Sequence, residues 1–285
     1  MNHVFFLFVG VVWGSSFIFM DRAGWAFGPI TIGVIGTLGG AVILGTTWFF
    51  RRTPCPSLWL RTPALLVMVI AGYSWPFAIQ PDLIEHVGHG YIAAFVCIVP
   101  ILTILISIPM LGEIPSPTQV AGVLVGFVFL SIYLRDGIER DVTVTMLVLA
   151  ASVPTGYAIS NCTLKRWFSD VPSVPLACVG LTISGLMLLP AALVFESIED
   201  TPNLREAIFG LSMLALLSRG ISVGFFYTLI RKRGPLFASM VTYMIPIIAL
   251  GWSWLDHERI TIKQLLAVAG ALAMVAVVQW DIERR

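Results

Sequence analysis

The segment YIAAFVCIVP, from Tyr91 to Pro100, has a counterpart in LFASMVTYMIP, from Leu236 to Pro246. In each segment a proline interrupts a long apolar run near its centre. The same two marks follow each segment, a glutamate that ends the run and a glutamine six residues later: Glu113 and Gln119 in the first copy, Glu258 and Gln264 in the second. This order and spacing predict a chain built from two copies of one unit, residues 1–136 and 137–285.

The composition places both copies in a lipid bilayer. Of the 285 residues, 58% are hydrophobic and 12% are charged, and the mean hydropathy is +0.91. A soluble domain of this size carries about 25% charged residues and cannot bury so much apolar surface. A net charge of +1 argues against nucleic-acid binding, and four cysteines argue against a disulfide scaffold. Long unbroken apolar runs argue against a transmembrane β-barrel.

Ten of these runs have the length, about 17–23 residues, that a helix needs to cross a bilayer. They are Val4–Met20, Ile30–Phe50, Pro63–Pro81, Tyr91–Met110, Thr118–Leu134, Val142–Thr163, Val174–Phe195, Ala207–Ile230, Pro235–Leu255 and Ile262–Trp280. Each copy holds five runs, and an odd number of crossings turns the second copy over relative to the first. We therefore expect an all-α membrane protein with ten transmembrane helices in two inverted five-helix repeats.

Lys and Arg predict how the helices are oriented, because they gather on the cytoplasmic side. With the N-terminus inside, ten lie in cytoplasmic segments: Arg51, Arg52, Arg61, Lys165, Arg166, Arg231, Lys232, Arg233, Arg284 and Arg285. Six lie in outer segments: Arg22, Arg135, Arg140, Arg205, Arg259 and Lys263. We expect an integral protein of the cell (inner) membrane with both termini in the cytoplasm.

The repeated motifs make the sequence resemble the EamA-like ten-helix members of the drug/metabolite transporter superfamily. The resemblance covers nearly the whole chain. The marks are Trp13-Gly14-Ser15-Ser16, Pro100, Leu111-Gly112-Glu113, Gln119, Pro246, Glu258 and Gln264. The second copy departs from the pattern, because Asp256-His257-Glu258 stands where the first has Leu-Gly-Glu. The resemblance implies transport of small metabolites by alternating access, often export, through a cavity lined by helices one, three, four, six, eight and nine. It implies no single substrate.

Arg219 is the strongest candidate for a binding residue. It lies in LALLSRGIS, near the middle of the run Ala207–Ile230 and too deep for its side chain to reach water fully. A charge at this depth costs about 3 kcal/mol, and no other run contains an Asp or Glu to offset it. One interpretation is that Arg219 binds a carboxylate or phosphate of the substrate in a wet cavity. The other is a structural arginine that binds carbonyls freed by Pro100, Pro154 or Pro246, or that reaches a carboxylate at a helix end.

Aromatic and hydroxyl side chains at a similar depth complete the predicted binding site. The rings are Trp13, Tyr73, Trp75, Tyr157 and Tyr243, and the hydroxyls are Ser16 and Ser222. Such rings offer an organic substrate both an apolar face and a polar tip. Ordinary helix packing is the alternative for each ring. The glycine pairs Gly36-x-x-x-Gly40 and Gly220-x-x-x-Gly224 are assigned to close helix packing.

Prolines and glutamates at equivalent positions are candidates for moving parts. Pro100 and Pro246 each remove a backbone donor inside a helix, which predicts paired hinges or static kinks. Glu113 and Glu258 end their helices, where a carboxylate either caps the next helix or acts as a gate.

The function expected from the sequence is a secondary transporter, an exporter of a small anionic or zwitterionic metabolite such as an amino acid. An exporter of cationic amines or drugs is the alternative, and a membrane-embedded enzyme is a third hypothesis. All four histidines lie at span ends, which leaves an enzyme no buried base. We expect no cofactor and no metal site. The expected partners are a small-molecule substrate and membrane lipid, with no nucleic acid, and a homodimer is left open.

Overall fold

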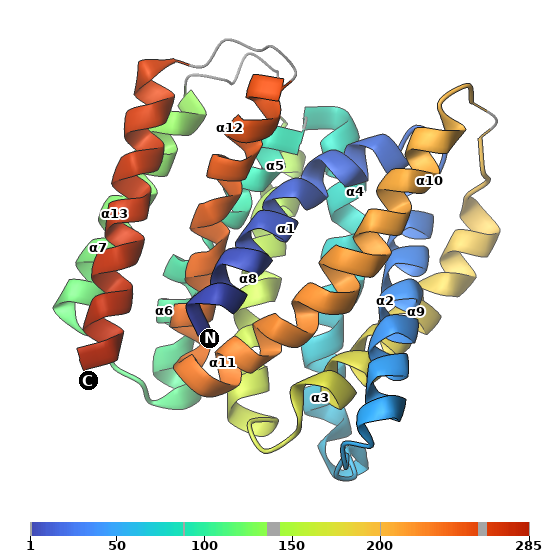
Figure 1. The fold of residues 1–285 in the computed structure, drawn as a ribbon, viewed down its shortest axis with the longest axis horizontal. Coiled ribbons are helices and arrows are strands. Elements are labelled where there is room, and N and C mark those ends of the chain that lie inside the picture. The colour runs from blue at the N-terminus through green and yellow to red at the C-terminus, as the bar shows by residue number, and fades with distance from the viewer. Residues whose placement is uncertain (1, 88, 136–142, 200, 256–260, 285) are drawn as a thin grey trace.

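The computed structural model describes residues 2–87, 89–135, 143–199, 201–255 and 261–284, and these residues form helices joined by short loops (Figure 1). In chain order the elements are α1 (Asn2–Ala23), α2 (Pro29–Arg51), η1 (Trp59–Arg61), α3 (Thr62–Val69), η2 (Ile70–Ser74), α4 (Trp75–Val87), α5 (His89–Val96), α6 (Val99–Leu111), α7 (Pro117–Arg135), α8 (Val144–Trp167), α9 (Ser173–Phe195), α10 (Leu204–Met213), η3 (Leu214–Ile221), α11 (Ser222–Ser239), η4 (Met240–Met244), α12 (Ile245–Leu255) and α13 (Ile262–Arg284). The expected all-helical fold is confirmed.

Seven segments of the described chain are long and apolar enough to cross a membrane. They are Asn2–Ala23, Pro29–Arg51, Trp59–His86, Val144–Trp167, Ser173–Phe195, Leu204–Ile248 and Leu265–Ile282, and two shorter apolar helices are Val99–Leu111 and Pro117–Phe129. The segment from 204 to 248 covers two of the expected runs, and Gly234 breaks it with φ 86°, a conformation that favours glycine. The number of membrane crossings stays a prediction.

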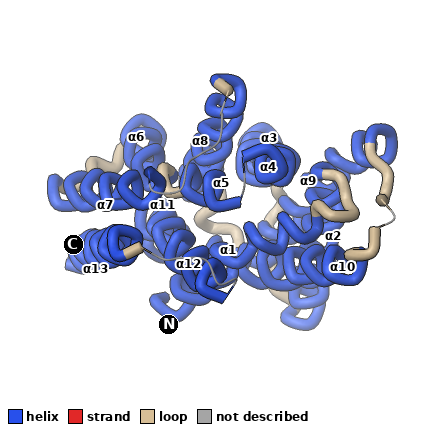
Figure 2. Tube along the Cα trace, turned by 90° about the horizontal axis from the view of Figure 1, so that it is seen from above, coloured by secondary structure: helices blue, strands red, loops and turns tan. Residues whose placement is uncertain are grey.

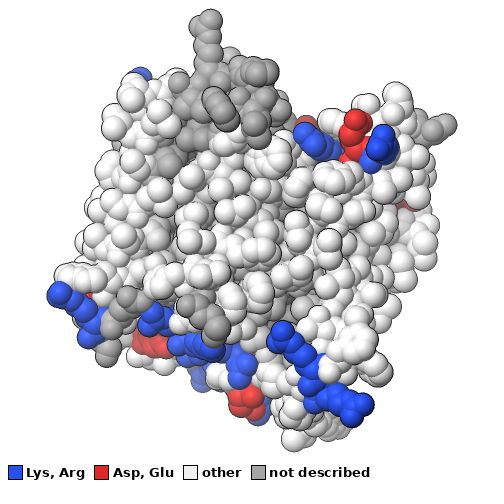
Figure 3. All heavy atoms as spheres, in the orientation of Figure 1, with Lys and Arg blue, Asp and Glu red and all other residues white. Residues whose placement is uncertain are grey.

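The surface fits a membrane protein. In Figure 3 uncharged side chains cover the middle of the visible face, and Lys and Arg gather along its lower edge. Large apolar side chains such as Phe49, Leu193 and Phe195 are more than 70% exposed, as lipid contact requires. In Figure 1, which has the same orientation as Figure 3, both ends of the described chain lie in the lower half of the molecule.

Two helix pairs join the first half of the chain to the second. Helix α2 packs along α9, and α7 packs along α13. The two pairs lie at opposite ends of the molecule, with α1, α8, α11 and α12 between them (Figures 1 and 2). Each pair contains corresponding helices of the two expected repeats, the second with the seventh and the fifth with the tenth.

Two long helices carry a π-helical segment near the middle of the membrane region. The first is η2 (Ile70–Ser74) and the second is η3 (Leu214–Ile221), in the third and eighth expected runs. A π-helix is rare and occurs most often at functional sites. Hydropathy did not predict either segment. A π-helix differs from an α-helix in its backbone hydrogen bonds, and this difference does not change which residues of a run are apolar.

Glycines allow the backbones of α2 and η3 to approach closely, as the glycine spacing predicted. A β-carbon built on Gly40 would lie 2.8 Å from the carbonyl carbon of Arg219, and one on Gly36 would collide with its guanidinium. A β-carbon on Gly220 would lie 3.2 Å from Ile43 of α2. Glycine is therefore required where α2 meets η3.

The start of α7 is capped by a serine rather than by Glu113. Ser116 Oγ accepts a hydrogen bond from the Gln119 amide (3.0 Å), and the Ser116 amide donates to Gln119 Oε1 (3.1 Å). This is a capping box. Ser116 Oγ and Gln119 Nε2 also donate to Asp281 of α13, at 2.7 and 2.9 Å. Gln119 thus joins the two halves.

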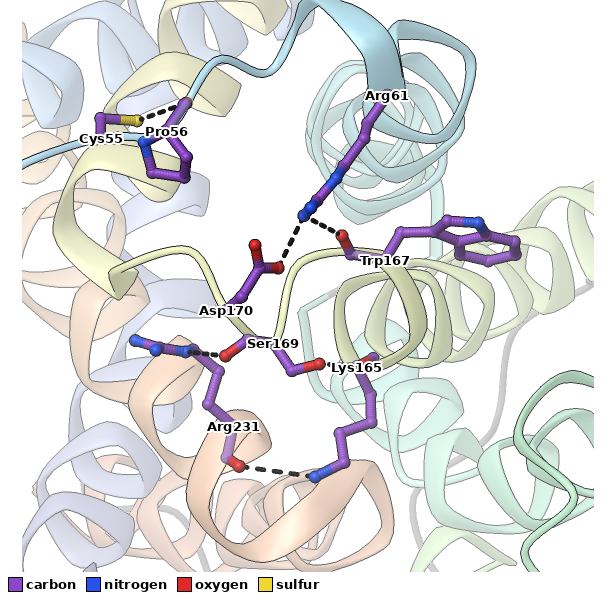
Figure 4. A network of polar contacts seen from close by, with 8 residues as sticks. All are labelled: Cys55, Pro56, Arg61, Lys165, Trp167, Ser169, Asp170 and Arg231. Atoms are coloured by element: carbon purple, nitrogen blue, oxygen red, sulfur yellow. Dashed lines mark hydrogen bonds and ion pairs between the residues drawn. The ribbon is translucent and has the colours of Figure 1, made fainter.

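The loop between α8 and α9 is held from both halves of the chain (Figure 4). Arg61 donates to the Trp167 carbonyl at 2.8 Å and pairs with Asp170 at 2.6 Å, and from α11 Arg231 Nε donates to the Ser169 carbonyl at 2.9 Å. The hydrogen bond from Arg61 lowers the pKa of Asp170 below its ordinary value. The exposed pair contributes little stability by itself, and the loop is held by the network.

We expect Gly40→Ala to destabilise the protein by about 1–3 kcal/mol, because the new methyl group meets the backbone of η3. Gly251→Ala is the matched control, since nothing lies within 4 Å of its β-carbon and alanine favours a helix by up to about 1 kcal/mol. Unfolding of both variants in detergent measures the difference. A Gly40→Ala protein as stable as Gly251→Ala would contradict the close approach of α2 and η3.

Candidate functional site

A cavity of about 80 Å³ lies between the two halves of the chain. Its walls come from α1, the η2–α4 region, the ends of α5 and α6 that face each other, α8, the η3–α11 region, η4 and α12. These elements belong to the first, third, fourth, sixth, eighth and ninth expected runs. Five of the predicted binding residues line it: Trp13, Ser16, Tyr73, Tyr157 and Arg219.

Arg219 lies on η3 with its side chain 2% exposed. Its Nη1 donates to the Ile32 carbonyl of α2 at 3.0 Å, and its Nη2 lies 4.0 Å from the sulfur of Met20. The guanidinium carbon stands 3.9 Å from the ring centre of Phe77, a cation–π contact. Among the described residues no carboxylate pairs with it. The guanidinium carries five N–H donors and therefore keeps free hydrogen-bonding capacity in the cavity wall.

Trp13 holds η3 in place from α1. Its indole nitrogen donates to the Ser218 carbonyl at 3.2 Å, one residue before Arg219. Its ring packs on Phe226, with 4.5 Å between ring centres. Ser16 donates to the Trp13 carbonyl at 2.7 Å, within α1. Trp13 thus both lines the cavity and positions the segment that carries the arginine.

Tyrosine side chains from the two halves also meet in the cavity wall. The Tyr73 hydroxyl of η2 donates to the Tyr227 hydroxyl of α11, and both side chains are about 5% exposed. The Tyr227 hydroxyl lies 3.7 Å from the sulfur of Met68. On α8, the Tyr157 hydroxyl donates to Gln80 Oε1 of α4 at 3.1 Å. These pairs surround the cavity with hydroxyl and amide groups.

Three predicted binding residues lie away from the cavity. Trp75 is 41% exposed and donates to Ser152 Oγ at 2.8 Å. The Tyr243 hydroxyl donates to the Val123 carbonyl of α7 at 3.0 Å, and its ring lies against Gly126. Ser222 is fully buried beside Arg219's segment, with a hydroxyl that has no partner among the described residues.

The predicted hinge residues lie at helix starts. Pro100 is the second residue of α6, just after the break that separates α5 from α6. Pro246 is the second residue of α12, directly after the 3-10 turn η4. Pro100 fits at a helix start, because its missing N–H has no partner to lose there. Pro246 follows a helical turn, so its missing N–H interrupts the backbone bonding between η4 and α12. Glu113 is exposed in the loop before α7, and Glu258 lies outside the described residues.

Sequence reasoning missed three residues of the cavity wall that contact the predicted ones. Tyr227 lies eight residues after Arg219, near the end of the expected run, and Gln80 lies at the end of its own run. The residue spacing could have found Tyr227, since positions close to two helical turns apart share a face. Phe77 was also missed, four residues after Tyr73.

The arrangement suits recognition of a small organic anion. Arg219 is the only charged side chain among the described residues of the cavity wall. A carboxylate or phosphate in the cavity would receive charge-assisted hydrogen bonds in a setting with little water to screen them. Aromatic side chains would cover the apolar part of the same molecule.

Comparisons with known proteins agree with this architecture. The EamA-like transporter family matches residues 1–135 and again residues 144–280. Two relatives from Bacillus subtilis (strain 168) are each 24% identical to the chain: Uncharacterized transporter YoaV over 263 residues (90% of this chain, 89% of the relative) and Uncharacterized transporter YvbV over 272 residues (94% and 87%). A solved crystal structure shares the fold, with a TM-score of 0.79 at 16% identity over 99% of this chain and 98% of its own. The chain therefore belongs to the EamA-like transporter family of the drug/metabolite transporter superfamily, and it is a membrane transporter rather than an enzyme.

Proposed function

We propose that the protein exports a small anionic or zwitterionic metabolite, such as an amino acid, by alternating access. One observation carries the proposal: a guanidinium in the wall of the central cavity has no carboxylate partner among the described residues. A buried charge without a partner is costly, and an anionic substrate offsets that cost each time it binds.

The Ile32 carbonyl and the Phe77 ring explain how the free protein tolerates the charge without neutralising it. A carbonyl dipole and a ring face each stabilise a cation by less than a carboxylate does. The site therefore keeps a preference for an incoming anion. The bonded carbonyl, that of Ile32, belongs to α2 and is not one freed by a proline, which supports the binding interpretation of Arg219.

We infer that residues 1–136 and 137–285 are two inverted five-helix repeats. The two separate family matches support this inference, as do the pairing of corresponding helices and the π-helical segments at corresponding places. An inverted repeat with its site between the halves is the usual structure of a transporter that opens alternately to each side. The gathering of Lys and Arg along one edge supports cytoplasmic termini (Figure 3).

We expect small carboxylates or phosphates to raise the melting temperature of the native protein and not that of Arg219→Gln. Ligand at a hundred times its Kd stabilises the folded state by about 2.7 kcal/mol, and loss of a charged hydrogen bond lowers affinity by roughly tenfold or more. A thermal-shift screen of anionic, zwitterionic and cationic metabolites against the purified protein measures both.

Arg205→Gln is the control for this screen, because Arg205 is exposed on α10, the helix that leads into η3. It should respond to anions as the native protein does. Equal stabilisation of the native and Arg219→Gln proteins would show that Arg219 is structural. A response to amines alone would favour the exporter of cationic amines, with Trp13 and the tyrosines as its site.

We expect Pro246→Ala to slow transport while the Kd for substrate stays within about twofold. Alanine can join α12 to the preceding turn and stiffen the joint next to the cavity. Substrate exchange in vesicles and binding in detergent separate the two effects. The control is Pro190→Ala, inside α9 and exposed on its outer face. Native exchange rates in Pro246→Ala would remove the hinge role.

A further inference from the structure

Asn161 is a polar side chain in the cavity wall that the proposed function does not yet use. It lies on α8, one helical turn after Tyr157, and it is 6% exposed. The hydroxyl of the preceding residue, Ser160, donates to the Met68 carbonyl of α3 at 2.9 Å. The two adjacent residues thus serve different purposes, and Ser160 ties α8 to α3.

The Asn161 amide makes no hydrogen bond with any residue that the structure describes, although one N–H₂ group and one oxygen are available. Helix-to-helix bonding, the ordinary role of such residues, therefore does not explain it. The residue lines the cavity, where the amide can exchange hydrogen bonds with a bound ligand. The neighbouring groups are occupied, since Tyr157 is bonded to Gln80.

The charge of the cavity restricts what Asn161 can bind. Arg219 is the only charged side chain among the described residues of the wall. One carboxylate on the substrate neutralises it, whereas an additional ammonium would find no anionic side chain among the described residues of the wall. An uncharged group that donates or accepts hydrogen bonds fits the amide without this cost.

We propose that Asn161 determines specificity by binding an uncharged hydroxyl, carbonyl or amide on a substrate whose carboxylate is held by Arg219. The inference rests on the proposed function, and it narrows the substrate to a monoanion with a neutral polar substituent. Asn161 lines the cavity from α8 and Arg219 lines it from η3, so the two substrate groups are held by different walls.

A matched set of carboxylates tests this assignment. The compounds are compared in groups of three. The members of a group have the same number of methylene groups, between two and five, and differ only in ending with a methyl, a hydroxyl or an ammonium group. Kd is measured by quenching of tryptophan fluorescence and by thermal shift, for the native protein and for Asn161→Leu. We expect the native protein to bind the hydroxyl compound roughly tenfold more tightly than the methyl compound at the best length. In Asn161→Leu this ratio should fall to about one or invert.

Asn203→Leu is the matched control, because Asn203 is exposed at the start of α10 and its side chain caps no backbone group. It should keep the native ratio. Asn161→Ala replaces Asn161→Leu if the larger side chain prevents folding.

Two outcomes would overturn the assignment while leaving the proposed function intact. One is a hydroxyl-to-methyl ratio that Asn161→Leu leaves unchanged, and the other is a native preference for the ammonium compound. If no carboxylate binds, or if Arg219→Gln binds all of them equally well, then the proposed function fails together with this assignment.

Discussion

The positive charge of Arg219 in the middle of an apolar helix is the constraint around which the centre of the molecule is arranged. Gly40 leaves room for its backbone and Gly36 leaves room for its guanidinium, because neither glycine carries a side chain. One carbonyl of α2 and the ring of Phe77 hold it there, and Trp13 positions the π-helical segment on which it lies. Three helices are thereby fixed by one residue, and the charge stays directed toward the cavity.

The two halves of the chain meet in different ways at the centre and at the ends. At the ends, α2 with α9 and α7 with α13 form long apolar contacts, reinforced by the bonds from Ser116 and Gln119 to Asp281. At the centre, apolar side chains of both halves pack together around the cavity, and hydrogen bonds such as the hydroxyl pair of Tyr73 and Tyr227 also cross between the halves. The proposed alternating access would rearrange the cavity walls while the end pairs stay together.

Much of this architecture could be predicted from composition and spacing. The apolar runs, the glycine contacts and five of the cavity residues follow from hydropathy and from depth within a run. The depth of a residue within an apolar run does not predict which way its side chain points around the helix axis. Tyr73 and Trp75 lie two residues apart and so point to nearly opposite sides, and only Tyr73 faces the cavity. The π-helical segments shift the register further, and no hydropathy pattern records that shift.

Flux of a small carboxylate into vesicles that contain the purified protein distinguishes an anion transporter built around Arg219 from an amine transporter. We expect vesicles with the native protein to take up a labelled monoanion faster than empty vesicles do, and we expect unlabelled anions to compete while amines do not. Vesicles with Arg219→Gln at the same density should take up the anion no faster than empty vesicles. Transport of amines without competition from anions, at equal rates in both proteins, would show that Arg219 does not bind the substrate.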